Sequence, residues 1–160
     1  MKNIIVSSLV QQLEEAYHKQ AWHGTNLRGS LRGLTLEQLC WRPTPKRHNI
    51  WEIAIHCAYW KYAVKRRITN EQRGAFLLKG SNWFTRPTEK TLAAWKKDLQ
   101  LLEETHENLI EVACKLSDKE LSHRVATKKF THLQTIQGIA LHDIYHAGQI
   151  QLLKRLQKKS

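Results

Sequence analysis

The sequence predicts an all-α fold, an up-down four-helix bundle with short extra helices and one long loop. Apolar residues recur at helical spacing in four long stretches. Capping-box spacings mark several helix starts, and the three prolines fall between the helical stretches, where prolines act as stops. Only residues 124–133 resemble a short extended segment, and nothing obvious would pair with them. Four amphipathic helices bury their apolar stripes most simply as a bundle.

The first half of the chain is expected to hold two long helices and a short one between them. The first long helix is expected from about residue 3 to about residue 32, with Gly33 as its C-terminal cap. Residues 35–38 have the spacing of a capping box and predict a short helix. Residues 49–52 have the same spacing and open the second long helix, which continues to about residue 68.

The second half is expected to begin with the long loop, at residues 69–87. A loop of this length in a compact domain is usually functional or partly ordered. The third long helix is expected at about residues 88–116, and a capping box at 117–120 predicts another short helix. The last long helix is expected at about residues 131–156, again with a capping spacing at its start.

Length and charge restrict the kind of protein. A chain of 160 residues indicates one globular domain covering residues 1–160. The formal net charge of +12 suits an anionic small substrate, a nucleic acid or an anionic membrane face. No helix-turn-helix or aromatic–basic motif accompanies the charge, so nucleic acid is not the expected partner and most of the charge is expected to be solvated surface. No long uncharged apolar run occurs, so no transmembrane helix is expected.

The cysteines indicate a reducing compartment. Cys40, Cys57 and Cys114 are widely spaced and form no CxxC motif, which argues against a disulfide framework or a cysteine zinc site. The N-terminus also lacks the features of a secretory signal, so a cytoplasmic protein is expected. Cys57 follows His56 directly, points about 100° around the helix from it and is expected in the core.

Three histidines lie on apolar stripes of two predicted helices. His142 and His146 are one turn apart, and the apolar residues around them place the pair on an inward face. His56 lies on a similar inward row with Trp60. Burying an unpaired imidazole costs about 1–3 kcal/mol, so three in one small core need partners.

One divalent metal ion would satisfy all three imidazoles together, as a compact tripod with open positions for water or substrate. The alternative is three separate core histidines that hydrogen-bond to neighbours or waters. Ligation by histidine alone suits zinc, nickel, copper or iron and does not select one of them.

Other residues are candidates for supporting roles. Asp143 stands where an H-E-x-x-H motif has its general base, but we expect it to orient a ligand imidazole or to face solvent, because Asp is shorter than Glu. Gln149 could also act behind the ligands, His23 could contact the metal or the substrate, and Trp60 and Trp83 could form walls of a substrate pocket. The remaining histidines are expected on the surface or in loops: His18, His48, His106, His123 and His132.

Nearly the whole chain resembles the DinB/YfiT-like superfamily of metal-binding helical bundles. The most specific parts are the segment around His56 and the HxxxHxGQI pattern at residues 142–150. The resemblance implies that His56, His142 and His146 bind a divalent metal and that the protein forms a homodimer. It also implies a thiol-dependent transferase or isomerase that uses a low-molecular-weight thiol such as bacillithiol or mycothiol, or else a hydrolase.

The expected function is therefore a metal-dependent enzyme that acts on a small molecule, with an anionic substrate suited to the basic surface. Two alternatives stay open: a metal-binding module without catalysis, for sensing or storage, and a nucleic-acid binder that rests on charge alone.

Overall fold

The computed structural model describes residues 4–125, 127 and 129–158, and this part of the chain is all-helical. Within it there is no strand, and the expected extended segment forms only an isolated bridge between Arg124 and Thr131. The helices, in chain order, are α1 (Ile4–Tyr17), α2 (Leu27–Ser30), α3 (Leu36–Cys40), α4 (Ile50–Thr69), α5 (Leu92–Cys114), α6 (Asp118–Leu121) and α7 (His132–Gln157).

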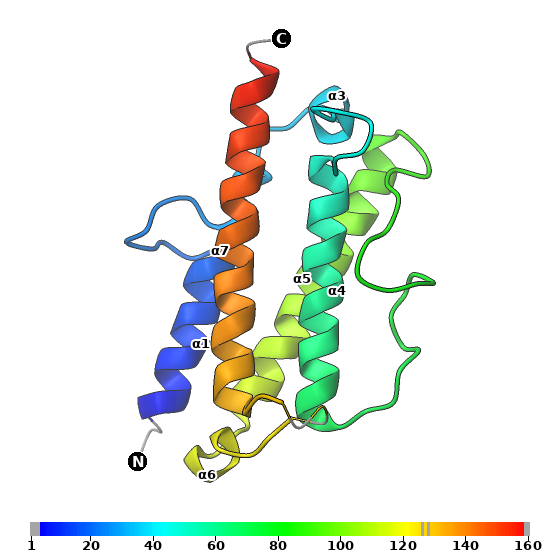
Figure 1. The fold of residues 1–160 in the computed structure, drawn as a ribbon. Helices are drawn as coiled ribbons and strands as arrows, with labels where there is room; N and C mark the ends of the chain where they lie inside the picture. The colour runs from blue at the N-terminus through cyan, green and yellow to red at the C-terminus, as the bar shows by residue number, and fades with distance from the viewer. Residues whose placement is uncertain (1–3, 126, 128, 159–160) are drawn as a thin grey trace.

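The four longest helices, α1, α4, α5 and α7, lie side by side (Figure 1). α4 packs against α5 and α7, and α1 packs against α7 and α5. Their apolar stripes meet in two clusters, one around Trp51 and Leu102 and the other around Leu13 and Leu109. Burial of these stripes is the main favourable term that holds the helices together.

The order of the helices differs from the alternating up-down order expected from the sequence. α1 and α7 run in one direction, whereas α4 and α5 both run in the other (Figure 1). Two contacts agree with a parallel α4–α5 pair: Trp51 donates to Asp98 near the starts of the helices, and Lys61 contacts His106 in their middles. The connection at residues 70–91 is long enough to return the chain along the bundle, which an up-down order would not require.

The predicted capping boxes are confirmed. In each, the N-cap side chain accepts from a backbone N–H three residues on, and that residue's side chain accepts from the N-cap backbone. They stand at Thr35–Gln38, Asn49–Glu52, Ser117–Glu120 and Thr131–Gln134. The starts of α3, α4, α6 and α7 are therefore encoded locally.

The first helix is shorter than expected. α1 ends at Tyr17, and the chain is irregular until Asn26 caps α2. Gly24 has a φ of +99°, a conformation that glycine adopts at little cost and that a helix cannot contain. Apolar periodicity alone did not reveal this break. The third long helix likewise begins at Leu92, four residues later than expected, because Thr91 supplies its cap.

None of the helices in the described ranges is long and apolar enough to cross a membrane.

Candidate metal centre

The three predicted histidines converge between α4 and α7. His56 lies on α4, and His142 and His146 lie one turn apart on α7. The Nε2 atom of His142 is 3.2 Å from Nε2 of His56 and 3.1 Å from Nε2 of His146. One nitrogen from each ring lies within 4.8 Å of the other two. The antiparallel α4–α7 pair thus brings residues far apart in sequence to one point.

Hydrogen bonds fix the proton on two of these rings. Nδ1 of His56 lies 2.8 Å from the backbone oxygen of Asn82, and Nδ1 of His146 lies 2.7 Å from Oε1 of Gln149. Both oxygens only accept, so each Nδ1 must carry the proton. In a neutral imidazole the other nitrogen then has a free lone pair. His56 and His146 therefore both present lone pairs at Nε2, and they cannot donate to each other or to His142.

This arrangement fits a divalent metal ion. Metal–nitrogen bonds of about 2.0–2.1 Å in a tetrahedral site place neighbouring nitrogens about 3.3 Å apart, close to the separations seen here. Burial lowers the pKa of His56 to about 4 and that of His142 to about 3, and it also lowers the pKa of His146. All three rings are therefore neutral near pH 7, the form that binds metals.

The long loop supplies much of the support for His56. Asn82 has a positive φ of 66°, which turns its carbonyl oxygen onto the His56 ring. Its side-chain oxygen accepts a hydrogen bond of 2.9 Å from Nε1 of Trp60. Trp60 therefore acts on the loop that holds His56, which explains its place one turn along the same helix.

Trp83 in the same loop is stacked between two histidines. Its ring lies 3.8 Å from the ring of His56, at 10° between the planes, and 3.6 Å from the ring of His48, at 3°. The stack covers one face of a predicted ligand and restricts its ring orientation. His48 is exposed in the loop before α4, as expected, but its stacking on Trp83 follows from no helical spacing.

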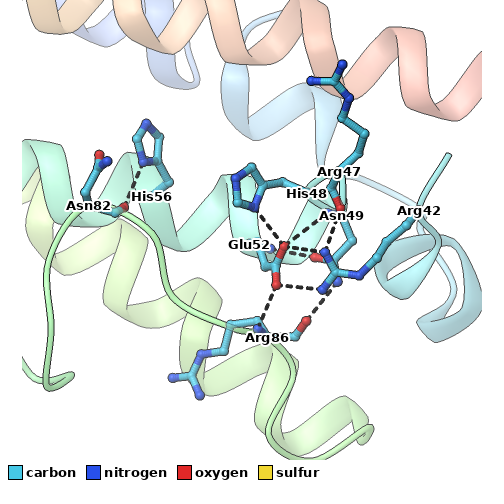
Figure 2. A network of polar contacts seen from close by, with 8 residues as sticks. All are labelled: Arg42, Arg47, His48, Asn49, Glu52, His56, Asn82 and Arg86. Carbon is cyan, nitrogen blue, oxygen red and sulfur yellow. Dashed lines mark hydrogen bonds and ion pairs between the residues drawn. The ribbon is translucent and has the colours of Figure 1, made fainter. Parts of the chain in front are cut away.

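A buried carboxylate, Glu52, contacts His48 at one end of this stack (Figure 2). Glu52 accepts a two-pronged hydrogen bond from Arg42, at 2.7 and 2.6 Å, and its Oε2 lies 3.1 Å from Nδ1 of His48. The backbone N–H of Arg86 donates to its other oxygen. Burial alone would raise the pKa of Glu52, but hydrogen bonds from Arg42, His48 and the Arg86 backbone outweigh it and lower the pKa. Glu52 thus ties the loop that precedes α4 and the connection at residues 70–91 to the N-terminus of α4.

A cavity of about 530 Å³ opens beside the three histidines. Its lining is mostly apolar and aromatic, with a few polar groups, as in many small-molecule sites. Gln149 lies on its wall and is tied to Tyr145, whose hydroxyl lies 3.0 Å from Nε2 of Gln149. Gln149 thus contacts His146 from the wall of the cavity.

Asp143 is placed differently from the two roles expected for it. Its side chain is fully buried, so it does not face solvent, and it forms an ion pair with the equally buried Lys61 of α4. Within the described part of the chain, its hydrogen-bond partner is this lysine and not a ligand imidazole. Lys61 had no predicted role, because a lysine in an amphipathic helix normally predicts an exposed position.

The remaining predictions concern Cys57 and the histidines outside the group of three. Cys57 is buried, as expected. His23 is exposed and lines a separate hollow between α1 and α7, not the cavity beside the three histidines. The surface placement expected for His106 is wrong, since that side chain is 1% exposed, and His132 is buried as well.

The family model of the DinB superfamily matches residues 19–150 of the chain. Among curated proteins, the chain is similar to one of the subunits of the aspartyl/glutamyl-tRNA(Asn/Gln) amidotransferase of Streptococcus pneumoniae, in strains CGSP14, G54 and JJA. In each case 35% of 72 residues are identical, over 45% of this chain and 15% of the relative. The chain thus spans a small part of those proteins' length. No solved structure matches it.

Proposed function

Since the chain belongs to the DinB superfamily, which is metal-binding, we propose that it is a four-helix-bundle enzyme with one divalent metal ion on His56, His142 and His146. The proposed reaction is transfer of a low-molecular-weight thiol to a small molecule, or hydrolysis of one. The convergence of three Nε2 atoms, two of them with lone pairs fixed by Asn82 and Gln149, carries the proposal.

An enzyme suits the site better than a storage or sensing module. The three imidazoles stand on the wall of a cavity of about 530 Å³, which has room for a small molecule. A storage site needs no such space, and structural metal sites are usually closed by a fourth protein ligand. Among the described residues, no fourth side chain joins the group of three.

A divalent ion on three neutral imidazoles keeps its full charge, which lowers the pKa of a thiol or a water and polarises a carbonyl. The residues of the chain set the conditions for this chemistry. Asn82 and Gln149 hold His56 and His146 with Nε2 toward the centre. Trp83 shields one face of His56 from water. The apolar lining of the cavity strengthens electrostatic interactions at the reacting atoms by lowering the local dielectric constant.

Three wider proposals accompany this one. We propose that residues 1–160 form one domain.

A homodimer is supported by exposed apolar side chains on one side of α7, namely Leu141, Tyr145 and Leu152. A cytoplasmic location is supported by the three cysteines, which are all free.

Metal analysis of the purified protein tests the site. The parent should bind one divalent ion per chain, and His142→Ala should lose most of it, because two remaining imidazoles hold an ion far more weakly. His23→Ala is the matched control, since His23 is exposed and lies outside the cavity. Equal metal content in the parent and in His142→Ala would refute the site.

Turnover assays then separate the reactions. The metal-loaded protein would be offered thiols with electrophiles in one series and simple esters and amides in another. Turnover in the first series that is lost in His146→Ala identifies a transferase, and turnover in the second series identifies a hydrolase. Metal binding without turnover in either series would favour the non-catalytic module.

A further inference from the structure

The cavity beside the three histidines has a basic end. Arg47 and His48 line it just before α4 begins, whereas His56 lies about two turns along that helix. Between these ends the lining is apolar, formed by Ile53, Leu152, Leu153 and Leu156 together with Trp83. Among the described residues that line the cavity there is no Asp or Glu. A substrate would thus meet the three imidazoles at one end and positive charge at the other.

The backbone of Arg47 is held firmly although its side chain is exposed. Its carbonyl oxygen accepts a hydrogen bond of 2.7 Å from the same Arg42 guanidinium that binds the Glu52 carboxylate. Its N–H donates to the carbonyl oxygen of Thr44 at 3.0 Å. The Glu52 network therefore positions the start of the Arg47 side chain, which reduces the entropy cost of using it to bind a ligand.

Two neighbouring arginines, Arg42 and Arg86, are already paired with carboxylates. Arg42 is neutralised by Glu52, and Arg86 lies 2.9 Å from Asp98. Arg47 forms no ion pair within the ranges that the structure describes, and its side chain points away from the Glu52 network toward α7 (Figure 2). Its five N–H donors are thus available in a geometry that matches a carboxylate.

His48 adds a second polar group at the same end. Because the ionised Glu52 carboxylate only accepts, Nδ1 of His48 must donate to it, and Nε2 is left for a further hydrogen bond. The stack on Trp83 and the contact with Glu52 fix the plane of the ring.

We infer that Arg47 determines specificity by binding a carboxylate of the substrate, while the reacting end of the same molecule lies at His56, His142 and His146. The substrate class is a small molecule with a carboxylate at one end, an apolar middle and a metal-binding or electrophilic group at the other. This inference rests on the proposed function, because it needs the metal site to define the reacting end.

Binding of a matched series of thiols tests the inference without any turnover. The protein would be loaded with cobalt(II) and titrated with mercaptocarboxylic acids of increasing chain length and with the mercaptoalcohols of equal length. The change in the visible absorption of cobalt reports binding. At the best length the acid should bind about tenfold more tightly than the alcohol, because the carboxylate gains charge-assisted hydrogen bonds from an exposed guanidinium.

Arg47→Gln should abolish the preference for the acid and leave the affinity for the alcohol unchanged. Lys46→Gln is the control, since it removes the same charge from an adjacent exposed residue that does not line the cavity, and it should keep the preference. Equal affinities for acid and alcohol in the parent would overturn the inference, as would an equal loss of preference in both variants.

Failure of the proposed function would look different. If cobalt does not bind, the metal site is wrong, and if cobalt binds but no thiol alters its spectrum, the proposed thiol chemistry is wrong. Either result also overturns the inference, the first because no metal defines the reacting end and the second because the acid shows no preferred binding.

Discussion

Two histidine clusters lie in the same bundle, and they differ in where their protons sit. In the first, His56, His142 and His146 meet between α4 and α7. In the second, Glu14, His18 and His106 also bring potential ligand atoms within 4.8 Å of one another. Spacing alone would rank the two as equivalent metal sites.

The two clusters differ in the hydrogen-bond partner at Nδ1 of their histidine rings. Oxygen acceptors on His56 and His146 hold the proton at Nδ1, so Nε2 is free to bind a metal. His106 has Lys61 at 3.3 Å from its Nδ1, and an ammonium group only donates, so the proton must sit on Nε2. Lys19 already lies 3.3 Å from the Glu14 carboxylate. In the second cluster, one nitrogen of His106 thus faces the Lys61 ammonium and the other carries a proton, so neither offers a metal the lone pair that His56 and His146 offer.

The largest expected difference is in metal content. His146→Ala should reduce bound divalent metal from one ion per chain to nearly none. His18→Ala should leave it unchanged, because the second cluster holds its protons and its carboxylate is already paired. Elemental analysis of both variants beside the parent measures this. A parent with two ions per chain, reduced to one in His18→Ala, would break the distinction.

Lys61 lies between the clusters, and its loss should cost the most stability. It pairs with Asp143 in the core, and both side chains are fully buried. Lys61→Met leaves a buried carboxylate without its partner, which typically destabilises a protein by about 3–5 kcal/mol. Lys65→Met breaks the more exposed pair with Glu71 and should cost less than about 1 kcal/mol. Urea unfolding of the two variants gives both values, and similar losses would show that Asp143 finds another partner.

Acid should destabilise the metal-free protein through both clusters. Unfolded imidazoles bind protons near pH 6.5, whereas burial lowers the pKa of His56 to about 4, of His142 to about 3 and of His106 to about 2. The unfolded state thus binds more protons between these values, so stability is fully present above pH 6.5 and is lost as pH falls. Each ring contributes up to about 1.4 kcal/mol per pH unit.

The free energy of unfolding, measured at pH 7, 6 and 5, tests this slope. His106→Gln should make the slope smaller by the contribution of one imidazole, up to about 1.4 kcal/mol per pH unit. Saturating metal should raise the stability at each of these pH values and leave the slope in place, because the folded rings are neutral with or without the metal. An equal slope in His106→Gln and in the parent would show that the pKa of His106 is not lowered by burial.

The smallest effect is expected for Gln149, which acts only through His146. Gln149→Ala should weaken metal binding about tenfold, at the lower end of the usual range for a residue that orients a metal ligand. Competition with a chelator of known affinity measures the change, and Gln151→Ala on the same helix is the control, since Gln151 does not line the cavity. Equal affinities in the two variants would show that the contact between Gln149 and His146 does not set the proton on that ring.

The sequence revealed the parts of the site that repeat with the helix. His142 and His146 share a face by spacing, and His56 lies on an inward row, so their meeting followed from amphipathic packing. Asn82 and Trp83 lie in the long connection and His48 lies in the loop before α4, and the paths of both loops have no helical period that would predict them. The burial of Lys61 and His106 depends on three helices meeting around them, so local patterning placed neither correctly.

The connection at residues 70–91 affects how the specificity of such a protein can evolve. It returns the chain along the bundle, and it also carries the carbonyl and the indole that frame His56. The helices that deliver the three imidazoles pack against one another, and Phe84 of this segment joins their core. Replacement of residues of the segment that lie outside this core can therefore reshape one wall of the pocket, and so alter which molecules enter, while the scaffold stays intact.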